Sequence, residues 1–324
     1  MNRVSIFLVS LLLVACSQPP RGEAPAPKPA SGGGLTFSES FWRVWSDGQA
    51  ELAAYELRYP RYNQSRRGVA VTIFVTEPFS QSQRVKADPG RHPSEDVFPV
   101  MKLNLIKDYQ TGIYDYNDMA SVFVALAPSG GLPAGATSKI SFSSQEWCGH
   151  VWHQVLFYPG RLQSDHHSYF DGEADQRQEL SIPADGLAED ALWHWARGMA
   201  LPELHPGEER EAPLLISLQK ARHAHVPLQV VRARLSRAAQ TQRVKTVLGE
   251  IEVEQMSMRL PDGFTRTFLV EKASPHRIVQ WNSSAGEEAV LLGVERMKYW
   301  ELNREGGERA LEKLGLKARP PKTT

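Results

Sequence analysis

One short segment near the middle of the chain carries the residues best suited to chemistry. It places Glu146, Cys148 and His150 at alternate positions. If the strand that starts near Ile140 continues unbroken, these three side chains lie on one inward face, with successive Cα atoms about 6.5 Å apart. A thiolate at Cys148 with His150 as its base would then be a nucleophile.

The same segment could instead supply ligands for zinc or copper, with help from a downstream polar stretch. The candidate pocket or metal residues are Glu146, Cys148, His150, His153, His166, His167 and Asp171. The C-x-x-C spacing of structural zinc sites is absent. Burial of Cys148 as a small hydrophobic residue is the favoured alternative, because cysteine is among the most buried residue types. A solvated polar loop is the favoured alternative for residues 165–171.

The elements that must position these residues are β-strands. Apolar and other residues alternate over 69–76, 101–106 and 122–126, and clusters of Gly, Pro and Asp separate these runs. We therefore predict a mainly β protein, built from one or more curved antiparallel sheets or half-barrels. One interior helix is predicted from about 185 to 199, where apolar residues recur every fourth position, and a short C-terminal helix near 308–314.

Composition shifts divide the chain further. We expect an N-terminal β-rich domain over 35–200, a polar connection over 201–212 and a C-terminal β-rich domain over 213–304, followed by a short helix and disordered tail over 305–324. Whether the two β-rich parts share one sheet is open at this stage.

The N-terminus indicates export. Residues 1–15 predict a signal peptide. A single early arginine, Arg3, is followed by an apolar run over 4–15 that is too short for a permanent membrane span. The run ends in Leu-Val-Ala-Cys, which resembles the lipobox of bacterial lipoproteins and implies diacylglycerol and palmitate on Cys16. Ser17 then implies delivery to the outer membrane, facing the periplasm. Residues 16–34 are rich in Pro, Ala and Gly and predict a flexible tether.

Charge excludes some partners. Lys plus Arg and Asp plus Glu both number 37, so no overall field favours nucleic acid. Between Pro213 and Gly249 the chain has no acidic residue, and Arg232 and Arg234 share one strand face. This face is a candidate anion-binding surface; a solvated strand face balanced by neighbouring glutamates is the favoured alternative.

Three segments carry a family resemblance. AVTIFVTEPF (70–79), SFSSQEWCGH (141–150) and HSYFDGE (167–173) resemble an uncharacterised family of bacterial exported proteins, some of which are labelled septum formation inhibitors. The C-terminal half is loosely similar to periplasmic half-barrels of the Lol carrier type. The resemblance implies an envelope protein with a curved sheet.

These observations together predict a cell-envelope lipoprotein that is not an enzyme. It would bind an apolar or amphipathic ligand, or a partner protein, on its curved sheet, with no cofactor beyond the covalent lipid and no nucleic acid. The alternative is a periplasmic thiol enzyme or metal-binding protein centred on Cys148 and His150.

Overall fold

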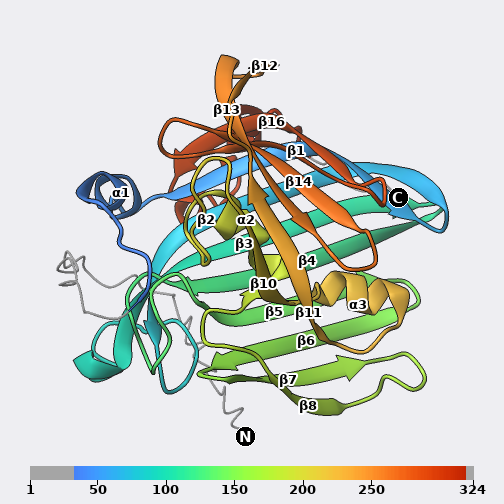
Figure 1. Ribbon diagram of the computed structural model, residues 1–324. Helices are drawn as coiled ribbons and strands as arrows, with labels where there is room; N and C mark the ends of the chain where they lie inside the picture. The colour runs from blue at the N-terminus through green and yellow to red at the C-terminus, as the bar shows by residue number, and fades with distance from the viewer. Residues whose placement is uncertain (1–32, 319–324) are drawn as a thin grey trace, which may run out of the picture.

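The computed structural model describes residues 33–318. The predicted signal peptide, Cys16 and nearly all of the predicted tether lie outside these residues, as do positions 319–324. Within them the protein is mainly β, as the alternating pattern predicts: one open, curved sheet of 16 strands carries the fold (Figure 1).

The first half of the sheet is an antiparallel meander in chain order. Each strand pairs with the next, so the connections alternate between the two ends of the sheet: those after β1, β3, β5 and β6 are two-residue turns, and those after β2, β4 and β7 are longer loops. The strands are β1 (Ala50–Arg61), β2 (Gln64–Ser80), β3 (Val97–Thr111), β4 (Tyr114–Ala125), β5 (Thr137–Glu146), β6 (Gly149–Tyr158), β7 (Arg161–Ser168) and β8 (Gln176–Ser181).

The second half continues the same sheet on the other side of β1. The strand β16 pairs with β1 over Ala50–Arg58, so the segments 35–200 and 213–304 share one sheet. From β1 the order runs β16-β15-β14-β13-β11-β10-β9, and β12 pairs with β13. These strands are β9 (Leu187–Ala188), β10 (Glu209–Leu215), β11 (Val230–Arg237), β12 (Gln242–Thr246), β13 (Gly249–Arg259), β14 (Thr265–Glu271), β15 (Ile278–Ser283) and β16 (Glu288–Met297).

The two outermost strands, β8 and β9, are joined by the short segment 182–186. The sheet must therefore roll so that its second half lies across its first half, and Figure 1 shows β11, β13 and β14 in front of β3–β6. The helix α2 (Leu192–Ala196) lies between these layers and is fully buried.

The interior helix is shorter than the sequence predicts. Leu187 and Ala188 pair with Leu214 and Leu215 as the parallel strand β9, so this edge pairing removes the first residues from the helix. The remaining helices and turns are α1 (Glu39–Trp45), η1 (Ser94–Asp96), η2 (Glu189–Ala191), α3 (Leu218–Ala224), η3 (Tyr299–Glu301) and η4 (Gly307–Leu314).

Aromatic side chains fill the space between the layers. Trp193 of α2 packs edge-on against Phe268 of β14 and Trp281 of β15, with ring centroids 5.3 and 5.5 Å away. Both strands belong to the second half of the sheet, which we call the upper layer. Trp281 also contacts Tyr55 of β1, at 4.5 Å. Such rings bury large apolar areas and stabilise the rolled arrangement. The concave side of the sheet is thus packed around α2.

Candidate functional site

The segment around Cys148 is a hairpin turn. The strand β5 ends at Glu146 and β6 begins at Gly149, and these two residues pair across the turn. The expectation of an unbroken strand is therefore wrong, because the chain reverses at Trp147 and Cys148. Glu146, Cys148 and His150 do not share an inward face.

The favoured burial of Cys148 is also wrong: the cysteine is free and exposed. A side chain at the tip of a hairpin projects beyond the sheet and has no second layer to cover it. His150, His167 and Asp171 are exposed as well. His167 pairs at the surface with Asp175, at 2.7 Å.

Three of the predicted residues lie in or beside a cavity of about 190 Å³. His153 and His166 line it with rings stacked at 4.5 Å, and the Nε2 atom of His153 lies 2.7 Å from the Ser164 hydroxyl. Burial lowers the pKa of His153 to about 3 and lowers that of His166, so both imidazoles are neutral at pH 7. Glu146 is next to this cavity, buried in an ion pair with Arg222 at 2.9 Å.

No group of three or more His, Cys, Asp or Glu side chains within residues 33–318 is arranged to hold a metal ion. The predicted ligands divide between the buried side of the sheet and its exposed strand faces and turns. The metal-binding alternative thus finds no assembled site among these residues.

Arg232 and Arg234 do share one exposed face of β11, where they alternate with buried Ala233 and Leu235. Arg234 lies 3.3 Å from Glu209 and 3.7 Å from Glu211, both on the neighbouring strand β10. Its charge is therefore balanced locally, in line with the alternative of a solvated strand face.

A large cavity, of about 690 Å³, opens between the two layers at the end of the sheet where the β1–β2 hairpin turns. Tyr59 to Ser65 of that hairpin form one wall and α3 forms another, through Gln219, Lys220 and His223. Phe264, Arg266 and the turn from Ser283 to Glu287 close the upper side. This volume falls in the range of about 300–1,000 Å³ that is typical of small-ligand sites.

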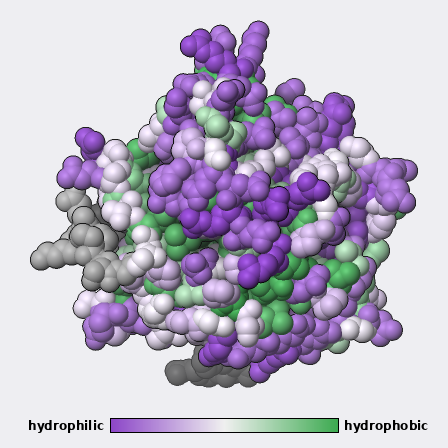
Figure 2. All heavy atoms as spheres, viewed as in Figure 1, coloured by the Kyte–Doolittle hydropathy of each residue, from purple (hydrophilic) through white to green (hydrophobic). Residues whose placement is uncertain are grey.

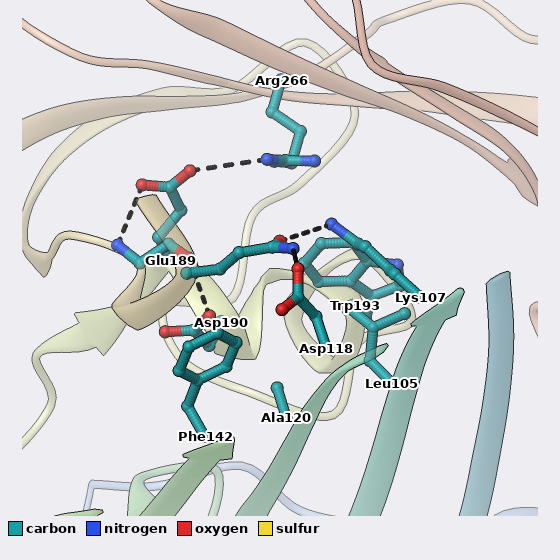
Figure 3. Close-up of a pocket in the computed structure, with 11 residues that line it drawn as sticks. Leu105, Lys107, Asp118, Ala120, Phe142, Glu189, Asp190, Trp193 and Arg266 are labelled. Carbon is teal, nitrogen blue, oxygen red and sulfur yellow. Dashed lines mark hydrogen bonds and ion pairs between the residues drawn. The ribbon is translucent and has the colours of Figure 1, made fainter. Parts of the chain in front are cut away.

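A buried ionic cluster forms the floor of this cavity. Glu287 is 2.8 Å from the Lys107 ammonium and 2.9 Å from the Arg266 guanidinium, and it accepts a hydrogen bond from the Trp281 indole at 2.9 Å. Arg266 also approaches Glu189, at 3.6 Å. Figure 3 shows Arg266 reaching from the upper layer toward Glu189, with Lys107 and Asp118 pointing up from β3 and β4.

The two cations hold Glu287 ionised. Burial alone raises the pKa of this carboxyl, but Arg266 and Lys107 together lower it well below its usual range. The cluster is thus a fixed set of charges beneath the cavity. The inner pocket that it surrounds measures about 10 Å³, space for roughly one water molecule.

A second polar chain runs beside the cluster. Gln219 accepts a hydrogen bond from Lys107 at 2.9 Å and donates one to Asp118 at 2.7 Å. Asp118 also lies 3.3 Å from His223 Nε2, and the other ring nitrogen of that histidine is 3.1 Å from the Tyr59 hydroxyl. His223 is thereby held in place at the cavity wall, between a buried carboxylate and a buried tyrosine.

Asp190 is expected to make stability depend on pH. Burial raises its pKa to about 6. The folded protein then keeps a proton that the unfolded chain releases near pH 4, so this group lowers stability as pH rises from about 4 to about 6. Asp190→Asn removes that slope, and the variant should gain on the order of 2–3 kcal/mol relative to wild type across this window. Urea unfolding at a series of pH values measures it; parallel stability curves would contradict the assignment.

The residues at the cavity floor were not among those singled out from the sequence. A signal for some of them exists: Lys107 continues the inward series of Met101, Leu103 and Leu105, and Arg266 precedes Phe268 and Val270 with the same parity. A charge at an inward strand position is costly to bury unless it is paired, and so marks a polar cluster in the interior.

Comparisons of the chain with protein-family models, with curated proteins and with solved structures give no match. The function must therefore be inferred from the chemistry of the site.

Proposed function

We propose that this protein is a lipid-anchored protein of the cell envelope that binds an amphipathic small ligand in the large cavity. The observation that carries this proposal is the cavity of about 690 Å³, which has aromatic and charged walls and opens at one end of the rolled sheet. The family resemblance stays a prediction and is compatible with this role.

The walls offer both apolar and polar contacts. The aromatic side chains of Tyr59 and Phe264 line the cavity. The Arg61 guanidinium lies 4.5 Å from the centroid of the Tyr62 ring and donates hydrogen bonds to two neutral oxygens, the Tyr116 hydroxyl and the His223 carbonyl. An amphipathic molecule would place its apolar part against the rings, with its polar part accepting hydrogen bonds from Arg61. A long acyl chain would not fit deeper, because aromatic side chains fill the interior behind the cluster.

The anchor rests on the sequence alone. Among residues 33–318 no helix has the length and apolarity needed to cross a membrane. The expectation of an anchor comes from Cys16, which directly follows the short apolar run. Radiolabelled palmitate should therefore enter the wild-type protein in a bacterial host, and should not enter Cys16→Ala. Equal labelling of both chains, or none in the wild type, would reject the anchor.

A bulky side chain at the cavity mouth should block the ligand. Ala285 is exposed and lines this mouth, and a tryptophan there would fill part of the opening. We expect Ala285→Trp, purified from membranes, to carry at least about tenfold less small-molecule ligand than wild type, because the mouth no longer admits it. Solvent extraction and mass spectrometry measure the amount.

The matched control is Ala239→Trp, which places the same side chain at an exposed alanine that does not line the cavity. This variant should retain the wild-type amount of ligand. Equal loss in both variants, or no loss in Ala285→Trp, would reject the cavity as the binding site.

A further inference from the structure

The four connections at one end of the first half of the sheet each carry a large, exposed hydrophobic side chain. They are Tyr62 of the β1–β2 turn, Ile113 of β3–β4, Trp147 of β5–β6 and Tyr169 of β7–β8, with exposed fractions of 52%, 79%, 70% and 73%. We refer to these four residues as the rim. Single exposed hydrophobic residues are common on soluble proteins, but a repeated placement at one end of a sheet needs an explanation.

The rim residues lie in a row at the same end of the sheet. Antiparallel pairing brings each hairpin beside the next, and Figure 1 shows all four turns at the right-hand end. Neighbouring tips are two strands apart, about 10 Å, so the row is roughly 30 Å long. Figure 2 shows both hydrophilic and hydrophobic atoms at the surface on this right-hand side.

Local contacts hold three of the four rim side chains, those of Tyr62, Trp147 and Tyr169. Trp147 stacks on Tyr114 with ring centroids 5.8 Å apart, and the hydroxyls of Tyr62 and Tyr116 are 2.6 Å apart. Tyr169 packs closely over Gly149, where any larger residue would collide with its ring. These side chains are therefore held in position on the projecting turns.

Turn chemistry alone does not account for the rim. Tyr62 has a φ of 54°, in the left-handed region where Gly, Asn and Asp are preferred and an aromatic residue is disfavoured. Trp147 and Ile113 likewise occupy turns where small polar residues are usual. A contact made by these turns with another surface would explain why large apolar residues occupy such positions.

We infer that the rim docks onto the headgroup region of the bilayer that carries the lipid anchor, an inference that rests on the proposed anchoring at Cys16. Tyrosine and tryptophan favour the interface between membrane and water, and isoleucine favours the acyl region below it. A bilayer can accept isolated projecting side chains one by one, whereas a protein partner needs a continuous complementary surface.

The geometry permits this docking and gives it a use. The described chain begins at the end of the sheet opposite the rim, where Leu35 donates a hydrogen bond to the Ala134 carbonyl in the β4–β5 connection. Residues 16–33 can reach at most about 60 Å when fully extended, which exceeds the length of about 40 Å of the 12-residue strand β4, so the rim can turn toward the membrane. Tyr62 and Asn63 also line the mouth of the large cavity. Docking therefore places that mouth at the bilayer surface, where an amphipathic ligand can pass between membrane and cavity without crossing water.

The exposed thiol of Cys148, next to Trp147, allows a direct test. The lipidated full-length protein is labelled there with an environment-sensitive fluorophore and reconstituted into vesicles of phosphatidylethanolamine and phosphatidylglycerol. A fraction of the lipid carries a nitroxide quencher at the headgroup. We expect quenching in wild type, and at least about threefold less in the double variant Tyr62→Ser, Ile113→Ser.

The matched control is Val247→Ser. Val247 is 58% exposed in the β12–β13 turn, which Figure 1 places at the top of the molecule, away from the rim. This variant should be quenched as wild type is. If palmitate is incorporated but the fluorophore is not quenched, membrane docking by the rim is rejected and the lipid anchor at Cys16 is supported. If palmitate is not incorporated, both claims are rejected. Energy transfer between fluorophores on two copies, with no quenching by lipid, would assign the rim to self-association instead.

Discussion

Glu287→Gln is expected to lower the free energy of unfolding by about 3–5 kcal/mol. The carboxylate is 4% exposed and neutralises two buried cations, Lys107 and Arg266. Glutamine keeps the shape but removes the charge, so both cations stay buried, with Glu189, 3.6 Å from Arg266, as a remaining counter-charge. Urea unfolding at pH 7, followed by tryptophan fluorescence, measures the change.

The neighbouring Glu288→Gln is the matched control, because its side chain is 46% exposed and lies 4.0 Å from Arg58 at the surface. It should change stability by less than about 0.5 kcal/mol. The difference between the two variants should shrink in acid. Because the pKa of Glu287 is lowered in the folded protein, the Glu287 carboxylate stabilises the fold fully at pH values above the ordinary pKa of glutamate, and this stabilisation is lost as the pH falls from there toward the lowered pKa. Equal effects of the two substitutions on the free energy of unfolding at pH 7 would show that the ion pairs of Glu287 with Lys107 and Arg266 do not stabilise the fold.

Arg197→Ala should have a similarly large effect, again about 3–5 kcal/mol. Arg197 follows α2 and donates to both carboxylate oxygens of Glu51 on β1, at 2.7 and 3.2 Å, and to the carbonyl of Pro275 at 2.8 Å. Both side chains of the ion pair are at most 4% exposed. The substitution leaves Glu51 as an unpaired buried charge and loosens the interior helix from the sheet.

The surface arginine Arg234 provides the comparison, since it also faces two carboxylates but is 55% exposed. Arg234→Ala should cost less than about 1 kcal/mol. Thermal or urea unfolding of both variants checks this. A loss below about 1 kcal/mol for Arg197→Ala would mean that α2 is held in the rolled sheet by apolar packing alone.

Local pattern was enough to predict the fold class. Alternation over 69–76 and 101–106 correctly indicated strands, since one buried face imposes a period of two. The pairing of β1 with β16 could not be predicted, because it joins residues more than 200 positions apart and local sequence carries no signal for such contacts. The interior helix lies within the predicted range of 185–199 but covers only Leu192–Ala196, so the prediction started too early and ended too late; at its start, edge pairing of Leu187 overrides the helical spacing.

The site was harder to predict than the fold. The choice between a continuous strand and a turn at Trp147 and Cys148 decides where every following side chain points, since a two-residue reversal changes the strand and its face. Glu146 was singled out for chemistry with Cys148, but it is paired with Arg222 from α3, an element that the β pattern of that region did not predict. The cavity walls come from segments distant in the chain, so only the inward charges Lys107 and Arg266 could have pointed to it.

The most direct test of the account is native mass spectrometry of the wild-type protein extracted from membranes in mild detergent. The account predicts a chain that lacks residues 1–15, carries covalent lipid and holds one small amphipathic molecule, which leaves at higher collision energy while the covalent lipid stays. A mature chain that carries covalent lipid but no releasable molecule at any collision energy would contradict the claim that the rolled sheet encloses a ligand site.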